Sequence, residues 1–217
     1  MLSDRSASDR LYNTPEGFNR TELQLAVVPV LTALTSYHQY LDITKQKEMV
    51  RCLETGLIYR CAKQCVVALS MCMVEMPGML IKSLPVLIVK LTHISATVTM
   101  AIPMLEFLST LVRLPHLYGN FAAEQYASVF AISLPYTNPS SLKFRLAVRQ
   151  ELTEAEPLKL NARFNQYIVF LAHHVIAMWF IRCRLSLRRD FVPYITKGLR
   201  SNVLQSFDDT PEKGSFR

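Results

Sequence analysis

The sequence predicts an all-α fold, a HEAT-like α-solenoid of stacked helical hairpins. Half of the 217 residues are apolar and only 19% are charged, which excludes disorder over most of the chain and supplies a sizeable core. Apolar residues recur at helical spacing in segment after segment. Only six glycines occur, which disfavours folds built on glycine-rich phosphate loops and many tight turns.

The chain opens with a polar, charge-balanced segment, 1–20, for which we expect a flexible leader. It contains no apolar stretch that could act as a signal peptide, so the sequence indicates a cytosolic protein. Residues Thr21 to Gln24 have the spacing of a capping box and predict a helix start. Asp42 predicts a second start, before an amphipathic helix with inward Met49, Leu53 and Leu57.

Six further helical segments are predicted at 60–75, 79–93, 97–113, 121–134, 164–183 and 187–206. Pro77-Gly78 ends the first of these, and the last is amphipathic and basic. A polar tail, 207–217, follows. The predicted repeat domain therefore occupies residues 21–206.

An apolar–Pro–apolar–apolar quartet recurs around Pro29, Pro85, Pro103 and Pro193. Each proline either starts a helix or kinks its second turn. The same device on several helices indicates repeated helical hairpins. Because the intervals are 56, 18 and 90 residues, any repeat is degenerate.

No catalytic residue, cofactor site or metal site is predicted. Neither a dinucleotide-binding glycine motif nor a P-loop occurs. The five cysteines include no C-x-x-C pair, and Cys61, Cys65 and Cys72 share a helical stripe typical of buried thiols. His173 and His174 are adjacent, so on a helix they point about 100° apart and do not readily chelate one ion. Both are expected to be structural.

The segment 164–181 has no formal charge and basic flanks, which fits a membrane span. His173 and His174 at its centre would be costly at bilayer depth. We therefore favour a buried central helix, with a membrane-anchored helical protein as the alternative.

Basic residues gather after this segment. They supply +5 of the net charge of +7 over residues 182–200, and the predicted contact patch is Arg182, Arg184, Arg188, Arg189, Lys197 and Arg200. With no nucleic-acid motif present, a protein-facing or solvated surface is expected. Ser206 and Thr210 have the flanking residues of phosphorylation sites.

Several stretches resemble the central region of the tuberin family. They are LTALTSYHQYLD at 31–42, the segment 91–140 from LTHISATVTM to PYTNPS, and the segment 164–217 from FNQYIVFLAHHVIAMWF onward. No counterpart is found for residues 141–163, which we interpret as an insert in a loop.

The resemblance implies a long α-solenoid in a GTPase-activating protein that, with hamartin, restrains the small GTPase Rheb and TOR signalling. It implies a cytoplasmic protein, peripheral on lysosomal or other endomembranes, within the tuberous sclerosis complex. The family's catalytic domain supplies an asparagine to Rheb-bound GTP and lies beyond this region. A non-catalytic scaffold segment is therefore expected, and no catalytic position is assigned to this chain.

Overall fold

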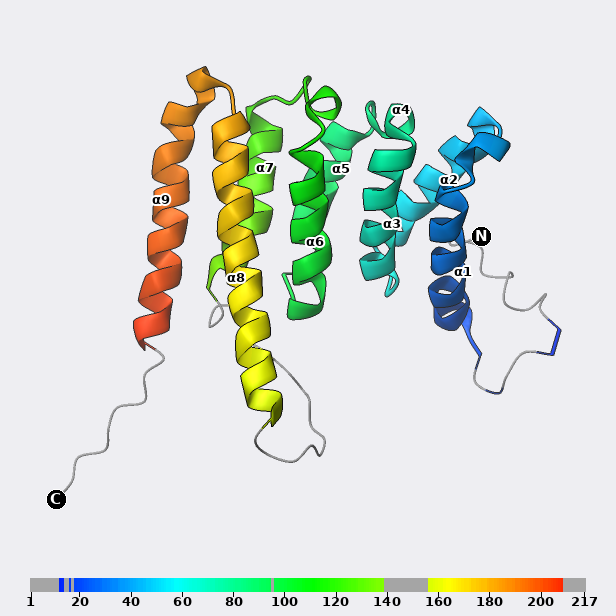
Figure 1. Cartoon of the computed structure of the whole chain (residues 1–217), viewed down its shortest axis with the longest axis horizontal. Coiled ribbons are helices and arrows are strands. Elements are labelled where there is room, and N and C mark those ends of the chain that lie inside the picture. Colours follow the sequence, from blue (N-terminus) through cyan, green and yellow to red (C-terminus); the bar gives the residue numbers. More distant parts are fainter. Residues whose placement is uncertain (1–11, 14–15, 17, 95, 139–155, 209–217) are drawn as a thin grey trace. The chain divides into compact units, whose positions relative to one another are not determined.

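The computed structural model describes residues 12, 13, 16, 18–94, 96–138 and 156–208, except for the side chains of 156–162 and 202–208. Within these ranges every regular element is a helix (Figure 1). The prediction of an all-α, solenoid-like fold is confirmed. Most of the predicted leader, residues 141–155 of the predicted insert and the tail from residue 209 lie outside the described residues.

The described elements, in chain order, are α1 (Arg20–Thr35), η2 (His38–Tyr40), α2 (Ile43–Gly56), α3 (Ala62–Glu75), α4 (Pro77–Leu80), α5 (Leu84–Thr92), α6 (Val98–Leu111), η3 (Pro115–Leu117), α7 (Ala123–Ser133), η4 (Leu134–Thr137), α8 (Glu156–Arg182) and α9 (Leu185–Asp208). They form two compact units. The first comprises residues up to Ile94 together with 106–122, and the second comprises 95–105 together with the chain from Ala123 onward.

The helix starts show which capping signals the chain uses. Asp42 caps α2 as predicted, because its Oδ1 accepts a hydrogen bond of 2.9 Å from the backbone N–H of Lys45. The predicted capping box at Thr21 is wrong. Asn19 caps α1 instead, accepting from the N–H groups of Thr21 at 2.9 Å and Glu22 at 3.3 Å.

In the first unit, α3 packs against α1, α2 and α4. Its inward face carries the predicted thiol stripe, and Cys61, Cys65 and Cys72 have no exposed surface. The buried Leu53 of α2 and Leu69 of α3 belong to the same core. The helical spacing of these apolar residues therefore predicted their burial correctly.

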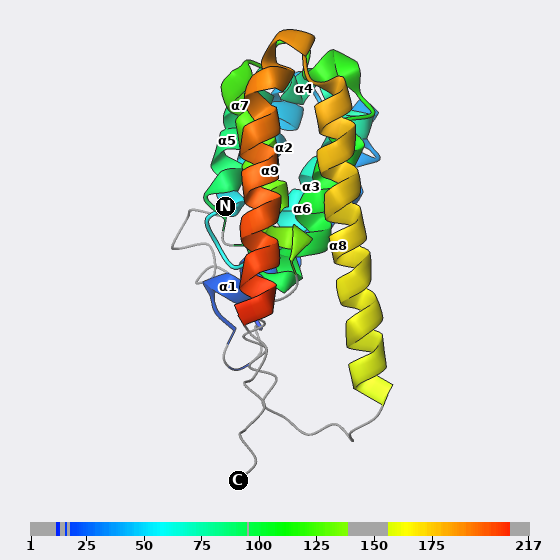
Figure 2. The ribbon, with the colours of Figure 1, turned by 90° about the vertical axis from the view of Figure 1, so that its left-hand side faces the viewer.

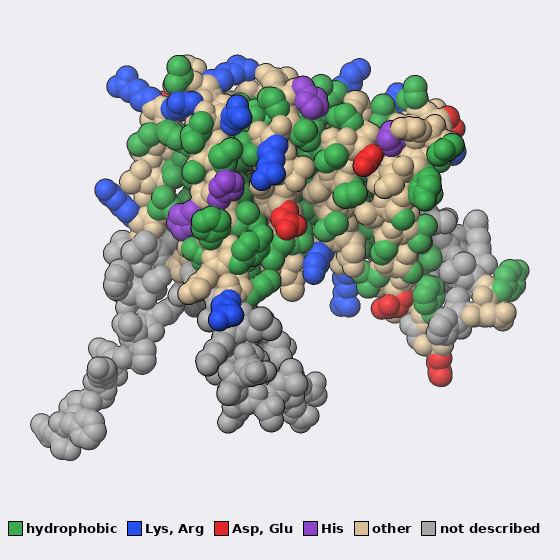
Figure 3. Space-filling view, viewed as in Figure 1, with side chains coloured by type: hydrophobic (Ala, Val, Ile, Leu, Met, Phe, Trp, Pro, Cys, Tyr) green, Lys and Arg blue, Asp and Glu red, His purple; other side chains and the backbone are tan. Residues whose placement is uncertain are grey.

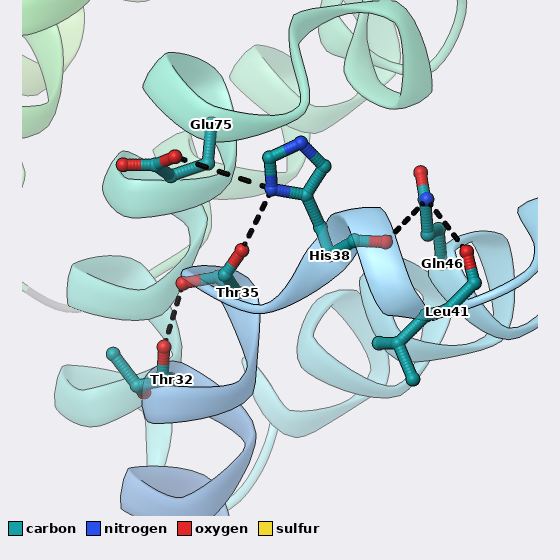
Figure 4. A network of polar contacts seen from close by, with 6 residues as sticks. All are labelled: Thr32, Thr35, His38, Leu41, Gln46 and Glu75. Carbon is teal, nitrogen blue, oxygen red and sulfur yellow. Dashed lines mark hydrogen bonds and ion pairs between the residues drawn. The ribbon is translucent and has the colours of Figure 1, made fainter.

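A polar network fixes the turn between α1 and α2 (Figure 4). The Nδ1 of His38 lies 3.0 Å from the carbonyl oxygen of Thr35 and 4.0 Å from a carboxylate oxygen of Glu75 on α3. Gln46 of α2 donates from its amide nitrogen to the carbonyl oxygens of His38, at 2.8 Å, and Leu41, at 3.0 Å. The network satisfies backbone carbonyls that the interrupted helix leaves without helical partners.

In the second unit, α8 and α9 run in opposite directions from a shared turn (Figures 1 and 2). Each packs against α7 and η4. The rings of Phe130 on α7 and Phe191 on α9 have centroids 5.2 Å apart. Gly198 permits close approach to η4, because a Cβ there would lie 2.7 Å from the Cδ1 of Leu134.

The recurring prolines match their predicted positions in part: Pro103 lies in the second turn of α6, whereas Pro29 and Pro193 lie in the third turn of their helices. Pro85 lies in the first turn of α5, where a missing N–H is tolerated. Pro29, Pro103 and Pro193 lie inside α1, α6 and α9. Each of these three removes one backbone hydrogen bond from its helix.

Candidate functional site: the outer face of α8 and the turn to α9

Helix α8 is buried on one face. Its inward residues recur every three or four positions and include Ile168, Ala172, Val175 and Trp179. The Trp179 ring meets Tyr126 of α7 edge to face, with centroids 6.1 Å apart. This side therefore anchors α8 to the second unit.

The opposite face of α8 is apolar and exposed. Tyr167 is 47% exposed, Phe170 is 69% exposed and Ile181 is 61% exposed. His174 and Ala177 are exposed between them and complete what we call the outer stripe. Figure 3 shows hydrophobic side chains and histidines along the position of α8, with basic side chains at both of its ends.

The prediction that this segment is buried as a central helix is therefore wrong in part. Among the described residues, one helical segment, Arg163–Arg182, is long and apolar enough to cross a membrane, and 28% of its most apolar window is buried. The composition was interpreted as burial on all sides, whereas neighbouring helices cover only one side. The helix also begins at Glu156, eight residues earlier than expected, and so takes in the last part of the predicted insert.

The two histidines have separate roles, as their adjacency predicted. The Nδ1 of His173 lies 2.8 Å from the carbonyl oxygen of Val169, and because a carbonyl only accepts, this nitrogen carries the proton. The His174 ring stacks on Phe170, with centroids 6.4 Å apart and planes 14° apart. Across the described residues, no group of three or more His, Cys, Asp or Glu side chains could hold a metal ion.

Arg188 closes the turn between α8 and α9. Its Nε donates to the carbonyl oxygen of Cys183 at 3.1 Å, and its Nη2 donates to that of Ile181. The guanidinium also lies over the Phe180 ring, 5.8 Å from the centroid. A cation that satisfies carbonyls at the end of a helix is favoured by the helix dipole. Arg188, a member of the predicted basic patch, therefore stabilises the turn through these contacts.

The rest of the predicted patch faces solvent in the described structure: Arg182, Arg184, Arg189, Lys197 and Arg200. Arg189, Lys197 and Arg200 are eight and three residues apart, which places them on one side of α9. Because α9 packs inward through Phe191 and Ile195, this basic side is available for contacts. The side chain of Ser206 and all of Thr210 lie outside the described residues, so both modification sites stay predictions.

The buried cysteines are poor nucleophiles. Burial raises the pKa of Cys72 to about 12 and also raises the pKa of Cys61 and of Cys65, whose sulfur atoms lie 3.9 Å apart. Burial likewise raises the pKa of Cys183, although the nearby charges of Arg188 and Arg184 act in the opposite direction. A thiol held in its protonated form lacks the reactive thiolate, so these residues serve packing.

Sequence reasoning missed a depression in the first unit. It has a volume of about 410 Å³ and lies between α1 and α3, lined by Pro29, Thr32, Lys63, Gln64 and Val67. Val67, Met71 and Val74 are exposed along the same side of α3 at intervals of four and three residues. That spacing was readable in the sequence, but its outward direction depends on which helices surround α3.

Comparison with known proteins identifies the family. A family model described as Tuberin matches residues 1–146 and 155–186, so its break falls at 147–154. The prediction that all of 141–163 lacks a counterpart in the family is therefore wrong outside those eight residues. The Tuberous sclerosis 2 protein homolog of Schizosaccharomyces pombe is 28% identical over 189 residues, which cover 86% of this chain. The match spans 14% of the length of that relative. The chain belongs to the tuberin family.

Proposed function

We propose that this chain is a non-catalytic scaffold segment of a tuberin-like GTPase-activating protein. With hamartin, that protein negatively regulates Rheb and, through it, TOR signalling. The observation that carries the proposal is the family match over most of the chain. The one-sided burial of α8 supports it, because an exposed apolar face on an ordered helix suits a contact surface.

The chemistry of the described residues agrees with a non-catalytic role. Four of its five cysteines, Cys61, Cys65, Cys72 and Cys183, are buried with raised pKa values, and its central histidines bond or stack within their own helix. We assign the GTPase-activating residues of the parent protein to another part of that protein. The parent protein would be located in the cytoplasm and associate peripherally with lysosomal or other endomembranes.

Co-precipitation with hamartin tests the scaffold role. The 217-residue chain should capture purified hamartin, and a version without residues 147–154 should do so equally well, because the family match is interrupted there and α8 begins after it. Failure of both versions to capture hamartin would contradict the proposal.

A Rheb assay tests the absence of catalysis. The purified chain should leave the rate of GTP hydrolysis by Rheb at its intrinsic value, and a preparation of full-length tuberin is the positive control. Stimulation of hydrolysis by the chain alone would overturn the non-catalytic assignment.

Membrane anchoring through α8 is a second candidate function, favoured by the length and composition of Arg163–Arg182. A spanning helix would have to expose His173 and His174 to hydrocarbon and release Trp179 from its packing with Tyr126. Carbonate extraction distinguishes the two functions, because a spanning helix stays with the pelleted membranes. We expect the chain in the supernatant.

A further inference from the structure

The outer stripe of α8 has the spacing of a helix-pairing seam. Tyr167, Phe170, His174, Ala177 and Ile181 follow one another at intervals of three, four, three and four residues, and all five are exposed. Alternating intervals of this kind mark the a and d positions of a heptad, which fit between the side chains of one partner helix. The stripe rises about 21 Å along α8, which corresponds to about four turns of a partner.

The stripe is too narrow and too polar for a lipid surface. His174 lies within it, and His173 and Gln166 are exposed along its edge. Burying these groups in hydrocarbon is costly, whereas a partner helix can place polar atoms beside them. The other side of α8 packs on α7 and η4, so the seam lies on the side of α8 that these elements leave exposed in the described structure.

Charge defines the partner further. Arg163 is exposed at one end of the stripe, and Arg182, Arg184 and Arg189 are exposed at the other. No acidic residue occurs from 157 to 189 in the sequence. Acidic residues at both ends of a partner helix would therefore meet opposite charges, and basic ones would be repelled.

We infer that the outer stripe of α8 docks one amphipathic helix that has apolar a and d positions and acidic residues at both ends. The inference deepens the proposed scaffold role and rests on it, because it names the surface and the chemistry of a protein contact.

The test uses two synthetic helical peptides of about four turns, with leucine at every a and d position. One carries glutamate at both ends, and its twin carries lysine at the same positions. Binding to the 217-residue chain is measured by fluorescence anisotropy. We expect the glutamate peptide to bind at least about tenfold more tightly than the lysine twin, a difference of about 1.4 kcal/mol.

Matched substitutions locate the binding. Phe170→Asp in the outer stripe should weaken binding of the glutamate peptide by at least about tenfold, because Phe170 is its most exposed aromatic member. Tyr167→Ser is a second, milder variant of the same surface. Val74→Asp on α3, at a residue 57% exposed in the first unit, is the control and should leave binding unchanged.

Three outcomes would overturn the inference. The two peptides could bind equally, or Phe170→Asp and Tyr167→Ser could leave binding intact in chains whose circular dichroism is unaltered. Alternatively, phosphatidylserine vesicles could capture the chain and lose it on Phe170→Asp while the peptides do not bind, which would assign the stripe to lipid.

Hamartin capture, run in parallel, separates this inference from the proposed function. If the unsubstituted chain fails to capture hamartin but discriminates between the peptides as expected, the hamartin scaffold proposal fails and the docking inference stands. If it captures hamartin but does not discriminate between the peptides, the docking inference fails alone.

Discussion

Helices α3 and α8 are both rich in apolar residues, yet their surroundings differ. In the first unit α3 packs against three helices, α1, α2 and α4, and buries its thiols. In the second unit α8 packs against α7 and η4 and leaves the outer stripe exposed. Apolar composition therefore sets how much surface a helix can bury, while its neighbours determine how much it does bury.

Opposite faces of α8 should differ most in their contribution to stability. Trp179→Ala removes a fully buried indole and should lower the free energy of unfolding by about 3–5 kcal/mol. Phe170→Ala on the outer stripe should change it by no more than about 0.5 kcal/mol. Urea unfolding followed by far-UV circular dichroism measures both. Equal losses would contradict the one-sided packing of α8.

A second pair of substitutions compares close packing in the second unit with an open position in the first. Gly198→Val should destabilise by about 1–3 kcal/mol, because a Cβ there already overlaps Leu134. Gly78→Val meets nothing within 4 Å and should stay within about 0.5 kcal/mol. Unfolding of the second unit in Gly198→Val can be followed by the fluorescence of the single tryptophan, Trp179. Unfolding of Gly78→Val can be followed by circular dichroism. A neutral Gly198→Val would show that α9 can move away from η4.

The buried thiols of α3 predict that the folded chain loses stability at alkaline pH. Burial raises the pKa of Cys72 from its ordinary 9.0 to about 12, so above pH 9 the unfolded chain releases this proton while the folded chain retains it. Stability is fully present below about pH 9 and should fall by about 1.4 kcal/mol per pH unit between about pH 9 and 12.

Cys72→Ala should remove that part of the pH dependence, as measured by urea unfolding at about pH 8 and about pH 10. Met73→Ala is the matched control, because it opens a cavity at a buried residue of the same helix without removing a titrating group. An unchanged difference between the two pH values in Cys72→Ala would contradict the assignment to this thiol.

Local patterns in the sequence predicted most helices and much of their inward faces, although the segment 79–93, predicted as one helix, is divided between α4 and α5. Asp42 could be recognised as a cap because a short carboxylate before an amphipathic segment has one favourable partner, the N–H three residues on. Thr21 was chosen wrongly over Asn19 because both residue types cap helices, and the choice depends on where the first turn begins. Two-residue ambiguities of this kind are settled by contacts made after the helices pack.

The outer stripe and the arrangement of the basic patch were only partly predictable. The basic residues of 182–200 could be found from composition, but the use of Arg188 in the turn depends on carbonyl oxygens that converge only when α8 ends at Arg182. The outer stripe had readable spacing, yet its exposure depends on the position of α7 and η4. Long-range packing therefore decided which apolar face became a surface.

The prolines inside α1, α6 and α9 have a consequence for local motion. Pro29, Pro103 and Pro193 have no backbone N–H to donate, so each of their helices contains one turn with one hydrogen bond fewer. Local opening of that turn therefore has fewer backbone hydrogen bonds to break. Amide hydrogens beside these turns should exchange with solvent faster than those of α3, which has no internal proline. Three of the four quartet prolines thus each place one point of weaker backbone bonding inside a helix.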